Sequence, residues 1–347
     1  MKHAAVIACV AAVCGLAQQP RIQNARLENR QVSGGLDATM TGILTAQTAP
    51  LWIGYAVPVI KGDRQMCCFN NGYACGCSLE GSNQNQVSTT NSGGAVRLVG
   101  PTHLVVLYRA EDHRVGKVRT FTPDCELDAG GLQFIWLNGV PPADSVKYLV
   151  PLAMQDGLRH GPLAAIAMHA DPSADQALEQ LTVASAPEKL RRDAAFWLGS
   201  ARGRRGYEIL GRMLRDDPSD KVREQAIFAL TQSKETDAVT TIIHAAHDDK
   251  SPHVRGQALF WLAHKAGDKV AAAIQNAIEN DPETEVKKRA VFALTQMPNG
   301  EGVPMLIQVA RTNRNAVVRK QAVFWLGQSK DPRALTFLEE VLTTNRL

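Results

Sequence analysis

The stretch VRGQALFWL, residues 254–262, has four counterparts that align with it without a gap. They are LRRDAAFWL (190–198), VREQAIFAL (222–230), VKKRAVFAL (286–294) and VRKQAVFWL (318–326). Each copy begins 32 residues after the previous one and carries a phenylalanine at the same place. Self-similarity at a fixed period indicates a repeat architecture. LRHGPLAAI at 158–166 resembles a degenerate sixth copy, as expected at the end of an array.

The segments between these copies predict a second helix in each repeat, because their apolar residues recur at helical spacing. These segments are Ala177–Val183, Gly206–Leu214, Ala238–Ala246, Val270–Ile278, Gly302–Ala310 and Arg333–Leu342. A two-helix unit of this size buries little apolar surface alone, whereas stacked units share one continuous core. The sequence therefore predicts an all-α solenoid over residues 141–347.

An aspartate, an arginine six residues later and a following A-x2-A/W-L resemble HEAT repeats, and the short unit is similar to the HEAT-like repeats of phycobilisome lyases. In that family the Asp and Arg link neighbouring units. The resemblance implies three such pairs: Asp217 with Arg223, Asp249 with Arg255, and Asp281 with Lys287. Two copies depart from the pattern, with Asn313 before Arg319 and Ser185 before Arg191. The resemblance implies a fold and no particular function, since such repeats serve many roles.

A helical wheel places a polar stripe of each repeated helix on the open face of the solenoid. The groove residues that we expect there are Arg192, Glu224, Lys288 and Lys320. The same stripe is expected to contain Gly256 and, one position after each stretch, Gly199, Thr231, Ala263, Thr295 and Gly327. The repeated phenylalanines lie at the border of this stripe and have two interpretations. They pack between repeats, which is the favoured one because buried aromatic residues usually pack, or Phe228, Phe260 and Phe292 line a peptide groove.

Residues before about Val140 lack the helical period and predict a small β-rich domain over residues 18–140, which makes the chain a multidomain α+β protein. The expected strands are Leu51–Ile60, Val96–Tyr108, Lys117–Phe121 and Leu132–Leu137. Pro58 interrupts the first of them, and this favours an edge position in the sheet.

The N-terminus has the pattern of a secretory signal peptide. Lys2 and His3 precede an apolar run from Ala4 to Ala17, which is too short to span a bilayer. We expect cleavage after Ala17 and a periplasmic or secreted mature protein. Two alternatives are lipid attachment at Cys9 and an uncleaved cytosolic N-terminus. No later segment reaches transmembrane length.

Five cysteines remain after such a cleavage, all of them before the repeats: Cys67, Cys68, Cys75, Cys77 and Cys125. An oxidising compartment favours disulfides among them. A zinc site is the weaker interpretation, because adjacent cysteines strain its geometry and structural zinc sites favour C-x2-C pairs. A redox role is weaker still, since no C-x-x-C is present. We therefore expect no metal site.

Composition and motifs favour a binding protein over an enzyme. The net charge of +4 is weak for a nucleic-acid binder, and no H-E-x-x-H, G-x-S-x-G or P-loop is present. The histidines, His169 among them, are expected at surface or cap positions, and Arg202, Arg204, Arg205, Arg212 and Arg215 form either a solvated patch or a site for an anionic partner. The predicted function is an exported scaffold for another protein or peptide, without a cofactor. The alternatives are a lyase-like or chaperone-like protein that handles a cofactor and a metal or redox sensor built on the cysteine cluster.

Overall fold

The computed structural model describes residues 19–62, 66–67, 69–70, 73–74, 77–80, 102–265 and 267–344. The chain divides into two compact units, Met1–Asp171 and Pro172–Leu347. The sequence placed this boundary at residue 140. Helices α2 (Pro142–Ala153) and α3 (His160–Met168) therefore lie in the first unit and outside the solenoid.

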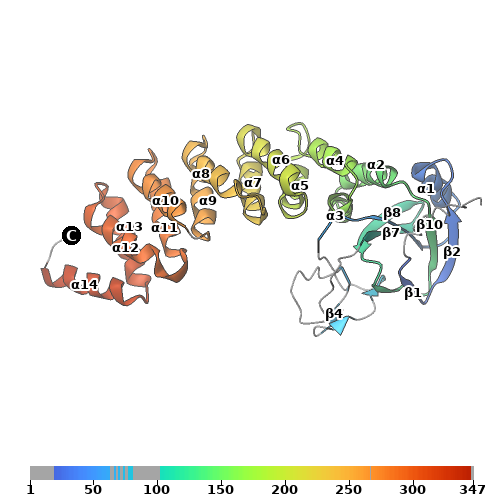
Figure 1. Ribbon diagram of the computed structural model, residues 1–347, viewed down its shortest axis with the longest axis horizontal. Coiled ribbons are helices and arrows are strands. Elements are labelled where there is room, and N and C mark those ends of the chain that lie inside the picture. Colours follow the sequence, from blue (N-terminus) through green and yellow to red (C-terminus); the bar gives the residue numbers. More distant parts are fainter. Residues whose placement is uncertain are drawn as a thin grey trace, which may run out of the picture. The chain divides into compact units, whose positions relative to one another are not determined.

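The first unit is built on a five-stranded mixed sheet with the order β2-β10-β3-β7-β8 (Figure 1). Its strands are β2 (Arg26–Gln31), β10 (Gln133–Asn138), β3 (Leu51–Pro58), β7 (His103–Glu111) and β8 (Arg114–Phe121). The pairs β2–β10 and β10–β3 are parallel, whereas β3–β7 and β7–β8 are antiparallel.

Strand β3 lies in the middle of this sheet, so the prediction that Pro58 marks an edge strand was wrong. Pro58 is the last residue of the strand and is exposed. The parallel pairing with β10 already ends at Gly54, so the missing N–H of Pro58 interrupts no ladder on that side.

Two smaller sheets complete the β structure. One has the order β1 (Arg21–Gln23), β9 (Glu126–Asp128) and β6 (Cys77–Ser78), and the other pairs β4 (Phe69–Asn70) with β5 (Tyr73–Ala74). A core cluster that includes Trp52, Phe134 and Trp136 lies between the five-stranded sheet and the β1-β9-β6 sheet and also contains Cys67, Cys77 and Cys125.

Three helices belong to this unit, and two of them correct the sequence analysis. Helix α1 (Leu36–Thr45) was not predicted, although Leu36, Met40 and Ile43 are buried at helical spacing. Helix α3 is not a sixth repeat, because it packs against β8. A Cβ on its Gly161 would lie 2.3 Å from the carbonyl oxygen of Val118, so only glycine permits this close approach.

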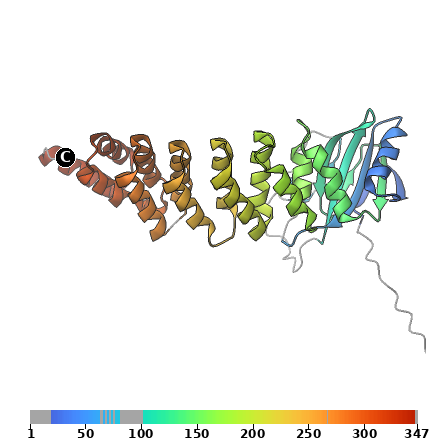
Figure 2. The ribbon, with the colours of Figure 1, turned by 90° about the horizontal axis from the view of Figure 1, so that it is seen from above.

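The second unit is a stack of helix pairs in sequence order (Figures 1 and 2). One layer, here called the motif layer, carries the five repeated stretches on α5 (Glu188–Ala201), α7 (Asp220–Gln232), α9 (Pro252–Ala263), α11 (Thr284–Thr295) and α13 (Ala316–Gln328). The other, here called the second layer, consists of α4 (Ser173–Leu181), α6 (Gly203–Asp216), α8 (Ala238–Asp248), α10 (Asp268–Asn280), α12 (Gly302–Thr312) and α14 (Pro332–Thr344). A short 3₁₀ helix, Pro298–Gly300, precedes α12.

The core of the stack repeats with the sequence. The first residue of each stretch is fully buried, from Leu190 to Val318, and so is the alanine four residues later. Neighbouring motif-layer helices approach closely at Gly199, where a Cβ would lie 2.1 Å from the carbonyl oxygen of Ala229. Among the described residues, no helix combines the length and the apolar content needed to cross a membrane.

Candidate functional site

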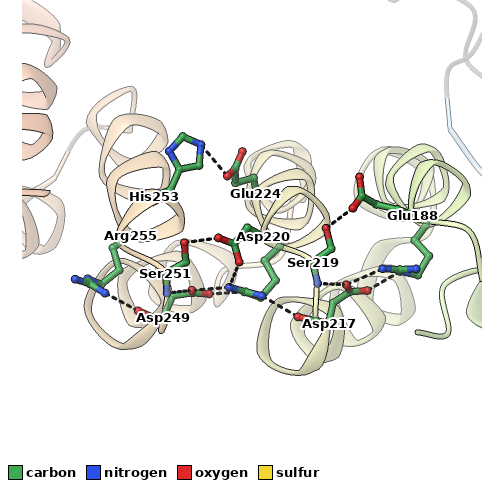
Figure 3. A network of polar contacts seen from close by, with 11 residues as sticks. Glu188, Asp217, Ser219, Asp220, Glu224, Asp249, Ser251, His253 and Arg255 are labelled. Carbon is green, nitrogen blue, oxygen red and sulfur yellow. Dashed lines mark hydrogen bonds and ion pairs between the residues drawn. The ribbon is translucent and has the colours of Figure 1, made fainter. Parts of the chain in front are cut away.

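A ladder of buried ion pairs joins successive repeats along one edge of the solenoid (Figure 3). Arg223 of α7 donates from Nε to Oδ2 of Asp249 over 2.8 Å and from Nη2 to Oδ1 over 3.0 Å. The same two contacts join Arg191 to Asp217 and Arg255 to Asp281. These side chains are at most 8% exposed, so each pair is shielded from solvent and from salt.

The ladder differs in one detail from the pairs that the family resemblance implies. Arg223 reaches Asp217, six residues earlier, through the backbone oxygen at 2.9 Å, and Arg255 reaches the backbone oxygen of Asp249 in the same way. The carboxylate of each aspartate instead pairs with the arginine of the preceding repeat, and it also accepts the backbone N–H two residues later, as Asp249 does from Ser251. Each aspartate thus connects two repeats and orders the turn before a motif-layer helix.

A second line of polar contacts runs beside the ladder. Ser219 donates to Glu188 over 2.8 Å, and Ser251 donates to Asp220 over 2.5 Å. The hydroxyl of Ser251, together with the charge of Arg223, lowers the pKa of the Asp220 carboxyl. These contacts therefore bind adjacent motif-layer helices at their N-terminal ends.

The ladder ends after α11, where both of its partners are replaced. Lys287 stands in the arginine position and donates to the backbone oxygen of Glu279. Asn313 stands in the aspartate position, and its side chain accepts only the N–H of Asn315 among the described residues. An aspartate left there without the arginine would be an unpaired charge, so the two replacements are physically consistent.

The aromatic side chains of the motif layer form a continuous row of ring contacts, here called the aromatic row. Its members are Phe196, Trp197, Phe228, Phe260, Trp261, Phe292, Phe324 and Trp325. The rings of Phe196 and Phe228 are stacked with centroids 6.5 Å apart, and those of Phe260 and Phe292 with centroids 6.2 Å apart. Trp261 bridges the stacked pairs, at 5.0 Å from Phe228 and 5.2 Å from Phe260.

The aromatic row reaches the surface over its whole length. Phe324 is 54% exposed and Phe196 is 37% exposed, while Phe228, Phe260 and Phe292 are half-buried. The rings contact each other across repeats, as the packing interpretation requires, yet they also present open faces, as a groove requires. Both interpretations therefore describe part of the geometry, and a binding role for these residues stays a prediction.

The predicted groove stripe lies to one side of the aromatic row. Arg192, Glu224 and Lys288 are half-buried there, and Lys320 is exposed. The sequence analysis also placed Gly199, Thr231 and Ala263 on the open stripe, and this was wrong, because these residues are buried. They lie on the flank that packs against the next motif-layer helix, as the contact of Gly199 shows.

Two polar rows that the sequence analysis missed flank the phenylalanines. Three residues before the phenylalanine stand Gln225, Gln257, Arg289 and Gln321, and four residues after it stand Gln232, His264, Gln296 and Gln328. These offsets lie on the same helix face as the phenylalanine. The glutamine that recurs within the aligned stretches, at 225, 257 and 321, could have predicted the first of these rows. In the described part of the chain, Gln225, Gln257 and Gln321 make no hydrogen bond through their side chains.

A buried polar network in the first unit corrects the expectation for His169, which is not at the surface. His169 is fully buried, and its Nδ1 lies 2.6 Å from the backbone oxygen of Ala165. Because that oxygen only accepts, Nδ1 carries the proton and Nε2 accepts from Ser145 over 2.8 Å. Ser145 in turn contacts Tyr55, which contacts Tyr108 over 2.5 Å. Burial raises the pKa of both tyrosines, and all four side chains of the network are buried.

The cysteines are brought together as a disulfide. Cys67 and Cys125 are bonded across 58 residues of sequence, and Cys77 is also disulfide-bonded. Cys68 and Cys75 lie outside the described residues. Asp124 lies beside the Cys67–Cys125 bond, but cysteines joined in this way offer no thiolate to a metal ion, so this cluster provides no support for a metal sensor.

Most arginines of the predicted basic patch are ion-paired. Arg205 and Arg212 both pair with Glu179, Arg204 pairs with Glu208 and Asp237, and Arg202 pairs with Asp175. Within the described residues, Arg215 has no ion pair. Because acidic residues offset most of these charges, the geometry favours the solvated patch over a site for an anionic partner.

The family comparison agrees with the repeat architecture of the second unit. The family model of HEAT repeats matches residues 207–275 and 270–346. No curated protein matches the chain in sequence. The solved structures that it resembles include human deoxyhypusine hydroxylase in complex with glycerol, at 18% identity over 58% of this chain and 90% of that one, with a TM-score of 0.26.

Two further solved structures are similar to this chain. The complex of CpcE and CpcF of phycocyanin lyase from Nostoc sp. PCC7120 matches at 20% identity over 46% of this chain and 100% of that one, with a TM-score of 0.33. Kap95p bound to RanGDP matches at 15% identity over 58% of this chain and 36% of that one, with a TM-score of 0.30. With the HEAT-repeat match and the observed helix pairs together, the C-terminal unit is a HEAT-like helical solenoid that follows a small β-rich region.

Proposed function

We propose that this protein is an exported scaffold that binds another protein through the aromatic face of its solenoid, the motif-layer surface that carries the aromatic row and its two flanking polar rows. The observation that carries the proposal is the continuity of the aromatic row across five helices. Single exposed aromatic rings are common on folded proteins, whereas a contiguous row of them at the surface is typical of an interaction site.

The composition of this face supports protein binding. Aromatic residues and arginine are enriched at the centres of protein interfaces, and a large ring contributes contact area with few rotatable bonds. The glutamines beside the rings offer both donors and acceptors to a peptide backbone. Extended surfaces of this kind are what stacked repeats use for recognition.

Two observations support export. The pattern of residues 1–17, which lie outside the described part of the chain, is that of a signal peptide. The disulfide between Cys67 and Cys125 fits an oxidising compartment, since cytosolic thiols are kept reduced. The mass of the protein recovered from an envelope or culture fraction tests this part, with loss of the residues up to Ala17 as the expected result. An intact Met1 in a cytosolic fraction would contradict export.

The binding test uses a displayed library of random peptides selected on the purified full chain. The selected peptides should lose affinity for the variant Phe228→Ser/Phe292→Ser. The matched control is Val183→Ser/Leu335→Ser, which changes two exposed apolar residues outside the aromatic face, at 48% and 60% exposure. Far-UV circular dichroism of all variants verifies the helical fold. Peptides that bind the first variant as well as the native chain would refute the proposed face.

The cofactor-handling alternative rests on the family resemblance alone and remains a prediction. Absorbance of the purified chain after incubation with candidate chromophores tests it.

A further inference from the structure

We infer that the segment held by the aromatic face is a proline-rich, acidic peptide in the polyproline II conformation, an inference that rests on the proposed function. Three independent features of the face lead to this class of ligand: the spacing of its repeats, the hydrogen-bonding character of its polar side chains, and the sign of its free charges.

The repeat spacing matches the pitch of polyproline II. Helices that pack side by side lie about 8–10 Å apart, which sets the step between equivalent side chains of the motif layer. A polyproline II helix has three residues per turn and rises about 3.1 Å per residue, so it presents the same side after about 9 Å. A β-strand covers this step in about three residues, and its two-residue period turns alternate repeats to opposite sides of the strand. A threefold ligand therefore presents the same side to each motif-layer helix in turn, whereas a β-strand does not.

The polar side chains of the face suit a ligand that has acceptors and few donors. A proline residue lacks the backbone N–H, so a proline-rich segment offers carbonyl oxygens that need donors. The amides of Gln225, Gln257 and Gln321 are free within the described residues and lie next to the rings. The indole Nε1 of Trp325 is buried without a partner among the same residues. The flat rings of proline pack on aromatic side chains, which is how aromatic-lined grooves select such segments.

Most charges of the face that lack an ion pair are positive. Glu285 is ion-paired with Lys288, whereas Glu224 lies 3.0 Å from Nε2 of His253, which is charged only when it is protonated. No ion pair occupies Lys189, Arg192, Lys221, Arg289 or Lys320 within the described part of the chain. The Nε of Arg192 is moreover buried without a hydrogen-bond acceptor among the same residues. Charge complementarity therefore favours carboxylates in the ligand, placed beside the prolines.

The test is fluorescence anisotropy with a labelled peptide of about twelve prolines, long enough for four repeat steps, flanked by glutamates. A peptide of equal length and charge, with glycine and serine in place of proline, is the reference. We expect the proline peptide to bind at least about tenfold more tightly than the reference, because it is already ordered before binding. The double variant Gln225→Ala/Gln257→Ala removes two half-buried amides that make no hydrogen bond within the described residues, and it should weaken the proline peptide about tenfold. Far-UV circular dichroism verifies that this variant keeps the helical fold. The control Gln275→Ala/Gln308→Ala, in the second layer, should leave binding unchanged.

The outcomes separate this inference from the proposed function. Equal binding of the two peptides, or equal effects of the two double variants, would overturn the proline-rich ligand. If library-selected peptides without proline bind through Phe228 and Phe292, the inference fails and the scaffold function stands. If no peptide of any kind uses the aromatic face, both fail.

Discussion

Replacement of Asp249 by alanine tests whether the buried ladder holds the repeats together. The change removes the two hydrogen bonds of 2.8 and 3.0 Å from Arg223 and the cap on the N–H of Ser251. Arg223 has a side chain that is 1% exposed, so water does not replace the lost carboxylate. Loss of one partner of a buried pair costs about 3–5 kcal/mol when the remaining charge is left uncompensated. Because Arg223 keeps its ion pair of 2.7 Å with Asp220, we expect a cost at the lower end of this range, about 3 kcal/mol.

The chain supplies its own control for this change. Asn313 occupies the equivalent turn, and its side chain accepts the N–H of Asn315 over 2.9 Å. Arg319 donates to its backbone oxygen, but within the described residues no arginine donates to its side chain. Asn313→Ala therefore removes the same backbone cap without stranding a charge, and the expected cost is about 1 kcal/mol.

The assay is hydrogen exchange followed by mass spectrometry on the full chain, because a chain of two units does not have to unfold in one step. The free energy of opening should fall in α7 and α9 for Asp249→Ala, and only slightly in α12 and α13 for Asn313→Ala. The double replacement Arg223→Met/Asp249→Leu should recover part of the loss, since it removes both charges. Equal destabilisation by Asp249→Ala and Asn313→Ala would refute the argument that the ion pair, rather than the turn cap, couples the repeats.

Three further predictions follow from burial, chain connectivity and ionisation. Phe260→Ala should lower the stability by about 1–2 kcal/mol and Leu259→Ala by about 2–5 kcal/mol, because the phenylalanine ring is half-buried and the leucine is fully buried. Urea denaturation of the two variants measures both values. A larger loss for Phe260→Ala would contradict the placement of its ring at the surface. Reduction of the Cys67–Cys125 bond should lower the stability of the first unit by about 4 kcal/mol, given the 58-residue separation of the two cysteines, and should leave hydrogen exchange in α5–α13 unchanged. An equal loss of stability in both units would contradict this prediction. The Asp220 carboxyl has a lowered pKa in the folded state, so its stabilising contribution is complete above about pH 4, the pKa of the unfolded chain, and is lost as the pH falls through the folded-state pKa. Asp220→Asn should therefore make the acid unfolding curve less steep. An unchanged acid unfolding curve would count against the contact with Ser251.

The solenoid could be predicted from the sequence because every repeat has the same pattern of apolar residues. The buried position at Leu190 and its equivalents recurs every 32 residues, so each copy supports the others. The expected second-layer helices coincide with α4, α6, α8, α10, α12 and α14 to within a few residues.

The buried and exposed positions of the aromatic face could be predicted less accurately than the helices. A helical wheel gives the direction of each side chain, but it does not show which neighbouring helix covers that direction. Gly199 was placed on the open stripe because its angle is close to that of Arg192, but the next helix covers that angle. In the first unit no repetition is available. The position of β3 depends on its pairing with β10, a strand about 80 residues later in the chain, and no local pattern encodes such a pairing.

The replacement of the ladder partners by Lys287 and Asn313 divides the solenoid into segments of different cooperativity. In a stack of repeats, the strength of each interface decides how far local opening spreads. Three successive ion-pair rungs tie α5, α7 and α9 to the turns that follow them, so these repeats should open together. The helices from α12 onward lie beyond the last rung and should fray first, as a separate unfolding unit. Under mechanical tension or mild denaturant, the protein would lose the Phe324 end of its aromatic row while the part from Phe196 to Phe260 remains assembled.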